Sequence, residues 1–126
     1  MKKRIESEDA PAAIGPYSQA IECNGTVYVS GQLPINSRTG KIAGMDIAAQ
    51  TEQSIRNVEA VLKAVNLDLS DVTMTTVLLT NIKDFKAMNE VYARYFTSEC
   101  PARAAFQVAA LPVDALVEIE AIAVRS

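Results

Sequence analysis

The sequence predicts an α+β domain in which two helices cover one face of a sheet of five or six strands. β-rich runs lie toward both ends of the chain, and two segments between them carry apolar residues at helical spacing. No linker, repeat or low-complexity segment interrupts the 126 residues, and a composition that is 49% hydrophobic and 21% charged is typical of a globular protein. We therefore expect one domain over residues 1–126.

The first two predicted strands form a hairpin. A loop punctuated by proline and glycine, residues 10–16 (APAAIGP), leads into β-rich runs at residues 17–23 (YSQAIEC) and 26–32 (TVYVSGQ). Asn24 and Gly25 separate the runs, and this dipeptide is a strong signal for a tight hairpin turn. The pattern predicts two adjacent antiparallel strands.

Two helices are predicted from the spacing of apolar residues. The first carries a stripe whose members are three or four positions apart: Ile47, Thr51, Ile55, Val58 and Leu62. Asp46 precedes this stripe and is a good N-cap candidate, because its side chain can accept a hydrogen bond from the first helical turn. The second helix is predicted from about Asp84 to Phe96, with the stripe Phe85, Met88, Tyr92 and Tyr95.

Three further strands are predicted at residues 72–79 (VTMTTVLL), about 102–109, and 116–124 (LVEIEAIAV). Several of them are apolar on both sides, although a sheet with one solvated face should alternate polar and apolar residues. Two helices can cover only one face of such a sheet. We therefore expect the second face to meet another copy of the chain.

The absence of histidine excludes several kinds of active site. It rules out Ser-His-Asp and Cys-His catalytic systems and any site with a histidine metal ligand. The two cysteines, Cys23 and Cys100, are too few for a zinc cage and lie far apart in sequence. We expect two reduced thiols and no metal site.

The charge pattern argues against nucleic-acid and membrane partners. The net charge is −3, and the short basic segment at residues 2–4 is followed at once by acidic residues. The first nine residues contain no apolar segment, and no run approaches 18 apolar residues. We expect a cytoplasmic protein with neither a signal peptide nor a membrane span.

Arg103 is an unusual residue in its setting. Its neighbours in the segment CPARAAFQVA, residues 100–109, are mostly small or apolar, although a guanidinium group stays charged at any relevant pH. A buried charge without a partner is costly. Either a carboxylate of the fold pairs with Arg103, or the group binds a carboxylate from outside.

Glu118 and Glu120 are the second unusual feature, because they lie two apart on an apolar strand and so share one face. Like charges this close raise the pKa of one of them, which suits a group that transfers protons. Spacing alone does not say which one, and either glutamate could instead pair with Arg103 or a lysine or face solvent. Four further residues are each compatible with a structural role or a place in a site: Tyr17, Ser30, Gly31 and Asn89.

Taken together, these residues resemble a known family. The segments APAAIGPYSQA, VSGQLP, CPARAAFQVAALP and VEIEAIAV occur in the order and spacing of the RidA (YjgF) family of imine deaminases, over essentially the whole chain. The resemblance implies a chorismate-mutase-like fold, with a mixed sheet of about six strands and two helices on one face. It also implies a homotrimer with a barrel-like centre and active sites in clefts between subunits.

The activity that the resemblance implies is hydrolysis of short 2-imino acids to 2-keto acids and ammonia, without a metal or an organic cofactor. Arg103 would hold the substrate carboxylate, while Glu118 and the backbone carbonyl of Ala105 would hold and polarise the attacking water. The remaining candidates would line the pocket: Tyr17, Ser30, Gly31 and, as a neighbour, Asn89. Many family members carry cysteine where this chain has Ala105, so a role of that thiol would make this protein a weaker deaminase.

Three other functions are weighed against this one. A regulatory protein could bind 2-keto acids without turnover, but it would need only Arg103 and not Glu118. RNA cleavage or translation inhibition fits poorly with an acidic chain that lacks histidine. Chorismate mutase chemistry requires several cations around its substrate, and only one well-placed arginine is found.

Overall fold

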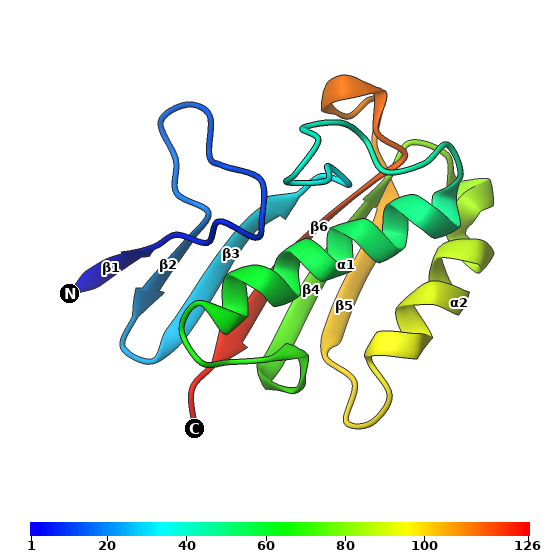
Figure 1. Cartoon of the computed structure of the whole chain (residues 1–126). Coiled ribbons are helices and arrows are strands. Elements are labelled where there is room, and N and C mark those ends of the chain that lie inside the picture. The colour runs from blue at the N-terminus through cyan, green and yellow to red at the C-terminus, as the bar shows by residue number, and fades with distance from the viewer.

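The computed structural model describes all 126 residues and forms two layers, a six-stranded sheet with both helices packed on one face (Figure 1). The strands are β1 (Lys2–Ile5), β2 (Ala20–Cys23), β3 (Thr26–Gln32), β4 (Val72–Leu79), β5 (Ala102–Gln107) and β6 (Val117–Val124). The helices are α1 (Ile47–Lys63) and α2 (Phe85–Tyr95). Neither of them is long and apolar enough to cross a membrane.

The strand order in the sheet is β1-β2-β3-β6-β4-β5. β4 and β5 are parallel, and every other neighbouring pair is antiparallel, so the sheet is mixed. The last strand of the chain, β6, lies in the centre, and β5 is an edge strand. The predicted fold class, a mixed six-stranded sheet with two helices on one face, is confirmed.

Both helices begin where the sequence predicts, to within one residue. The Asp46 side chain accepts a hydrogen bond from the Ala49 N–H at 2.8 Å, so it is the N-cap of α1. All five members of the predicted α1 stripe are buried against the sheet. In α2, Met88 and Tyr92 are buried, while Phe85 and Tyr95 are only partly covered.

The first strands differ from the prediction in two ways. β2 begins at Ala20 and not at Tyr17, because the Tyr17 N–H donates to the Gly15 carbonyl and closes a turn there. The structure also contains β1, which pairs with β2 although its sequence, KKRI, has no strand pattern. The hairpin turn is confirmed, since Asn24 and Gly25 both have positive φ, as a two-residue turn of this kind requires.

The two faces of the sheet are covered very differently. On the helix side, the core includes Val77 and Leu79 of β4 and Val117 and Ile119 of β6. The other side, here called the open face, is covered by no element of the chain (Figure 1). Apolar residues occupy it all the same: Tyr28, Met74, Leu78, Phe106 and Ile122.

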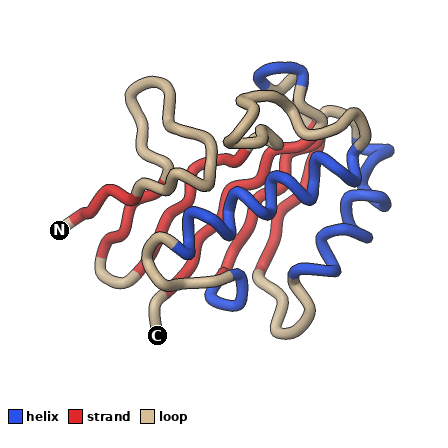
Figure 2. The backbone as a smooth tube through the Cα atoms, viewed as in Figure 1, coloured by secondary structure: helices blue, strands red, loops and turns tan.

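Three long loops lie at the same end of the sheet, at residues 6–19, 33–46 and 108–116 (Figure 2). A side chain of α1 fastens two of them. The Gln50 amide accepts a hydrogen bond from the Leu116 N–H and donates one to the Gly44 carbonyl. These loops surround the last residues of β3 and the first residues of β6, where several of the predicted site residues lie.

Candidate functional site

The predicted site residues fall into two groups, whose charged members leave the sheet from opposite faces. Arg103 pairs with Thr75 in the β4–β5 ladder, and Thr75 is buried under the helices, so the arginine points to the helix side. Glu118 pairs with Leu78 and points to the open face. We call the first group, Arg103 and Asn89 together with the neighbouring Phe85 and Tyr92, the arginine site. The second group is the glutamate site (Glu118, Gly31, Ser30, Tyr17).

In the arginine site, one face of α2 holds the guanidinium group. Nη1 of Arg103 donates a hydrogen bond to Oδ1 of Asn89 at 2.6 Å. The Cζ atom of Arg103 lies 4.7 Å from the ring centroid of Tyr92 and 5.5 Å from that of Phe85. Because residues 85, 89 and 92 follow one another at helical spacing, all three side chains reach the same guanidinium.

Arg103 has no acidic partner within its own chain. The chain forms three ion pairs, and none of them involves this residue: Arg4–Glu6, Arg56–Glu59 and Arg125–Glu22. The alternative in which Glu118 or Glu120 pairs with Arg103 is therefore wrong for the single chain. A partly buried cation with neutral and aromatic neighbours keeps N–H donors for an anion from elsewhere.

In the glutamate site, the carboxylate of Glu118 occupies space that only a glycine leaves free. A Cβ atom on Gly31 would lie 2.0 Å from Oε2 of Glu118. Gly31 does not have positive φ, so close approach and not backbone conformation requires glycine here. Burial and, second, the negative charge of Glu120 raise the pKa of the Glu118 carboxyl group.

Ser30 and Tyr17 extend the glutamate site toward the loop at residues 6–19. The Ser30 hydroxyl donates to the Ser18 carbonyl at 2.6 Å, so it holds the segment that follows Tyr17. Tyr17 is 54% exposed and lines a pocket of about 330 Å³ together with Gly31. The other apolar residues around this pocket are Pro11, Ala12, Ile14, Leu33 and Ile35.

A search for known relatives gives consistent matches. A family model described as Endoribonuclease L-PSP matches residues 7–125. A Bos taurus protein named 2-iminobutanoate/2-iminopropanoate deaminase is 48% identical over 125 residues, which cover 99% of this chain and 91% of that protein. A RutC family protein of Pyrococcus horikoshii is 49% identical over 125 residues and covers 99% of both chains.

The chain belongs to the RidA (YjgF) family. Solved structures agree with this assignment. The YjgF gene product of E. coli has a TM-score of 0.95 at 44% identity, and E. coli TdcF with bound serine has a TM-score of 0.94 at 43% identity. Each comparison covers 98% of this chain and 99% of the other. The resemblance inferred from the sequence motifs is confirmed.

Ala105 is the remaining predicted site residue. It lies two residues beyond Arg103 on the same side of β5 and pairs with Val77. β4 lies between Ala105 and the strand of Glu118, so two strand spacings of about 4.8 Å each separate them. Within one chain, the carbonyl of Ala105 therefore belongs with the arginine site.

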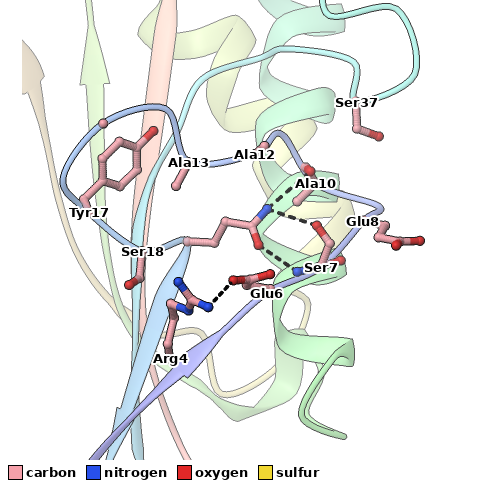
Figure 3. A pocket seen from close by; sticks show the side chains of 12 residues that line it. Arg4, Glu6, Ser7, Glu8, Ala10, Ala12, Ala13, Tyr17, Ser18 and Ser37 are labelled. Atoms are coloured by element: carbon pink, nitrogen blue, oxygen red, sulfur yellow. Dashed lines mark hydrogen bonds and ion pairs between the residues drawn. The ribbon is translucent and has the colours of Figure 1, made fainter.

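Gln19 is a buried polar residue of this RidA chain that the sequence analysis missed. Its side-chain carbonyl accepts from the Ser7 N–H, and its amide donates to the carbonyls of Ser7, Ala10 and Pro11. A second pocket of about 720 Å³ lies beside it, with Ser7 and Ala10 on one side and Tyr17 on the other (Figure 3). Gln19 thus fixes the loop that carries Tyr17. A lone glutamine between small residues gave no sequence signal.

No group of three or more Cys, Asp or Glu side chains is placed to bind a metal ion. The two thiols are also separate, since Cys23 is partly buried in β2 and Cys100 is exposed before β5. The chemical groups that the two sites offer are therefore a guanidinium, a carboxyl group with a raised pKa, and hydroxyl and backbone groups.

Proposed function

We propose that this protein hydrolyses short-chain 2-imino acids to 2-keto acids and ammonia. The observation that carries the proposal is the guanidinium of Arg103, which is held in place by α2 but has no carboxylate partner. Relatives from cattle and human, at 48% and 44% identity, are named as 2-iminobutanoate/2-iminopropanoate deaminases, which supports the same activity. The serine bound to TdcF supports a small ligand with a carboxylate.

In the proposed reaction, Arg103 binds the substrate carboxylate through two parallel N–H donors and so orients the C=N bond. A water oxygen adds to the imine carbon while Glu118 takes a proton from this water and passes it to the nitrogen, which gives a carbinolamine. Glu118 then takes the proton of the new hydroxyl group and passes it to the amino nitrogen, and its raised pKa suits both transfers. As the C=O bond forms, the C–N bond breaks, and ammonia leaves the 2-keto acid. The carbonyl of Ala105 is a second acceptor for the water.

Two copies of the chain must build each active site under this proposal. Arg103 and Glu118 leave opposite faces of one sheet, so the arginine site of one copy has to face the glutamate site of the next. Such a contact joins two different surfaces, and contacts of this kind close into rings. A homotrimer, which the family resemblance implies, would also cover the apolar open face.

The pocket beside Tyr17 supports a preference for short side chains. Its volume of about 330 Å³ is bordered by Ile14, Leu33 and Ile35, and no cationic side chain lines it. Imines derived from serine or threonine would place a methyl or ethyl group there. We expect bulky or dianionic imines to react slowly.

The second candidate function is binding of 2-keto acids without turnover. Such a protein would use Arg103 in the same way, but binding alone does not require the Glu118 carboxyl group in the space beside Gly31. The family description also names an endoribonuclease. The net charge of −3 and the absence of histidine argue against RNA as the substrate here.

A coupled assay tests the proposal directly. A pyridoxal-phosphate dehydratase acting on threonine generates 2-aminocrotonate in situ, and semicarbazide competes with hydrolysis for the imine. Addition of this protein should raise the yield of 2-oxobutanoate and lower that of the semicarbazone, whereas Arg103→Lys should do so far less. Equal yields with and without the wild-type protein would exclude deaminase activity, and pyruvate binding without turnover would favour the binding protein.

A further inference from the structure

The guanidinium of Arg103 is supported by aromatic rings as well as by a hydrogen bond. Asn89 accepts a hydrogen bond from Nη1, while the Cζ atom of Arg103 lies within cation–π distance of the Tyr92 and Phe85 rings. Contacts with aromatic rings use no N–H donor, so a hydrogen bond engages only Nη1. The other N–H donors of the guanidinium are left for a carboxylate.

Tyr92 is the most rigidly held of these neighbours. It is buried, and its hydroxyl group lies 2.7 Å from the hydroxyl oxygen of Thr75. Its ring also packs on Phe96, with 4.5 Å between the ring centroids. Phe85 and Asn89 are only partly buried, so the Tyr92 ring has the least freedom to move.

Thr75 connects this ring to the strand that carries the arginine. It is the ladder partner of Arg103 in the β4–β5 pair, and its side chain is fully buried. One residue therefore lies beside the backbone of Arg103 and also fixes the ring beneath its guanidinium. Burial raises the pKa of Tyr92, so its phenol stays neutral and does not cancel the positive charge of Arg103.

We propose that Tyr92, held by Thr75, is a positioning residue that keeps the guanidinium of Arg103 in the plane needed for two-point capture of a substrate carboxylate. The inference rests on the proposed function, because it assumes that Arg103 binds that carboxylate. Tyr92 would touch no reacting atom. Its ring sets the angle of the guanidinium, and Thr75 sets the angle of the ring.

The variant Tyr92→Leu tests the proposal, because it removes the ring and keeps an apolar side chain. We expect both KM for the imine and the dissociation constant for pyruvate to rise about tenfold, the size of a partly buried cation–π contact. The turnover number should change much less, because the carboxylate is bound equally in the ground and transition states. Tyr92→Phe retains the ring and should recover most of the affinity.

The chain offers a matched control in Tyr95. This residue lies on the same helix, and its ring also carries an arginine, with Cζ of Arg56 at 5.3 Å, but it does not contact Arg103. Tyr95→Leu should leave the pyruvate affinity unchanged. Thermal denaturation and light scattering on all variants would separate a loss of stability or assembly from a loss of affinity.

A double-mutant comparison shows whether the effect passes through the arginine. In an Arg103→Ala background, Tyr92→Leu should produce no further loss of pyruvate affinity. An equal further loss there, or wild-type affinity in Tyr92→Leu alone, would overturn the proposal. If Tyr92→Leu does not fold, Tyr92→Phe and Thr75→Val decide. Both keep the ring and break the same hydrogen bond, so each should cause the same small loss of pyruvate affinity, and the double variant should lose no more than either alone. A wild-type protein that neither binds pyruvate nor turns over the imine would instead refute the proposed function.

Discussion

The arginine site and the glutamate site differ in how completely one chain builds them. Arg103 has a hydrogen-bond partner and two aromatic neighbours, all from α2, and its orientation is set within the chain. Glu118 forms no ion pair, lies in space left by Gly31, and is only partly buried. The single chain therefore fixes the position of Arg103 more completely than that of Glu118.

Under the proposed function, this difference separates substrate binding from proton transfer. A guanidinium that binds a substrate needs rigid support, which a helix packed on a sheet provides. A carboxyl group with a raised pKa needs partial burial without a cationic partner, and Glu118 meets both conditions on the open face. The following predictions test the two sites separately.

The largest effect is expected for Glu118→Gln. The amide keeps the size of the side chain but cannot accept a proton, so the turnover number should fall about a hundredfold to a thousandfold. Pyruvate affinity, which depends on the arginine site, should stay within about twofold. Steady-state kinetics and calorimetry measure the two quantities, and Glu120→Gln is the matched control. If Glu120→Gln is inactive and Glu118→Gln is active, the wrong carboxylate has been chosen.

Glu118→Gln should also raise thermal stability slightly at neutral pH. The pKa of Glu118 is raised in the folded protein, so the folded state holds the proton more tightly than the unfolded state does. Stability therefore falls as the pH rises from the unfolded pKa to the folded one, and the neutral amide avoids this loss. A lower melting temperature than wild type at pH 7 would contradict the assignment.

Arg103→Lys should cause the next largest loss. Lysine keeps the charge but lacks the planar guanidinium with its paired N–H donors. It would also lose the hydrogen-bond geometry to Asn89 and most of the contact with the Tyr92 ring. We expect kcat/KM to fall about a hundredfold, on the order of 2–3 kcal/mol, with a higher dissociation constant for pyruvate. The oligomer mass by light scattering should not change. Normal turnover would mean that Arg103 does not bind the substrate.

Gly31→Ala should reduce activity by a smaller factor. The new methyl group would clash with Oε2 of Glu118, so the carboxyl group has to move, and we expect the turnover number to fall about tenfold. Gly25→Ala is a useful contrast, because Gly25 has a φ of +80° and an added Cβ would come no closer than 4.0 Å to the Arg125 carbonyl oxygen. That variant should lose stability and keep its turnover number. Unchanged kinetics in Gly31→Ala would show that the position of Glu118 is not critical.

The smallest effect is expected on the pH profile of Glu120→Gln. Glu118 must be ionised to accept a proton, so activity falls as the pH drops through its pKa. Burial is the main cause of the raised pKa, and the charge of Glu120 is the second. Removing that charge should lower the pKa and move the acidic limb of kcat to lower pH. A shift to higher pH would contradict this.

The sequence predicted the helices well because their periodicity and the Asp46 cap are local signals. It did not predict β1, since the polar segment KKRI becomes a strand only by pairing with β2. The unusual setting of Arg103 was also evident from its small and apolar neighbours. The sequence did not show that Arg103 lacks a carboxylate partner, because this depends on the face of the sheet to which each side chain points.

The relation between Arg103 and Glu118 shows the limit most clearly. Their separation depends on the strand order β6-β4-β5 and on two registers, and neither follows from spacing along the chain. Asn89 was expected as a neighbour of the pocket, and its side-chain carbonyl accepts a hydrogen bond from Arg103; its place beside a bound substrate stays a prediction. Tyr92 was predicted only as part of an apolar stripe, because an aromatic residue at helical spacing is usually a core residue.

The most direct test of the account is complementation between two inactive variants. If each active site combines the arginine site of one copy with the glutamate site of the next, a mixed oligomer of Arg103→Lys and Glu118→Gln chains contains some intact sites. In a head-to-tail trimer that contains both kinds of chain, one of the three sites pairs an intact Arg103 with an intact Glu118, whichever chain is in excess. Co-expression with two tags and purification of the mixed trimer should therefore restore about a third of wild-type kcat/KM. If the mixed oligomer is as inactive as its parents, both residues act within one chain and the account is wrong.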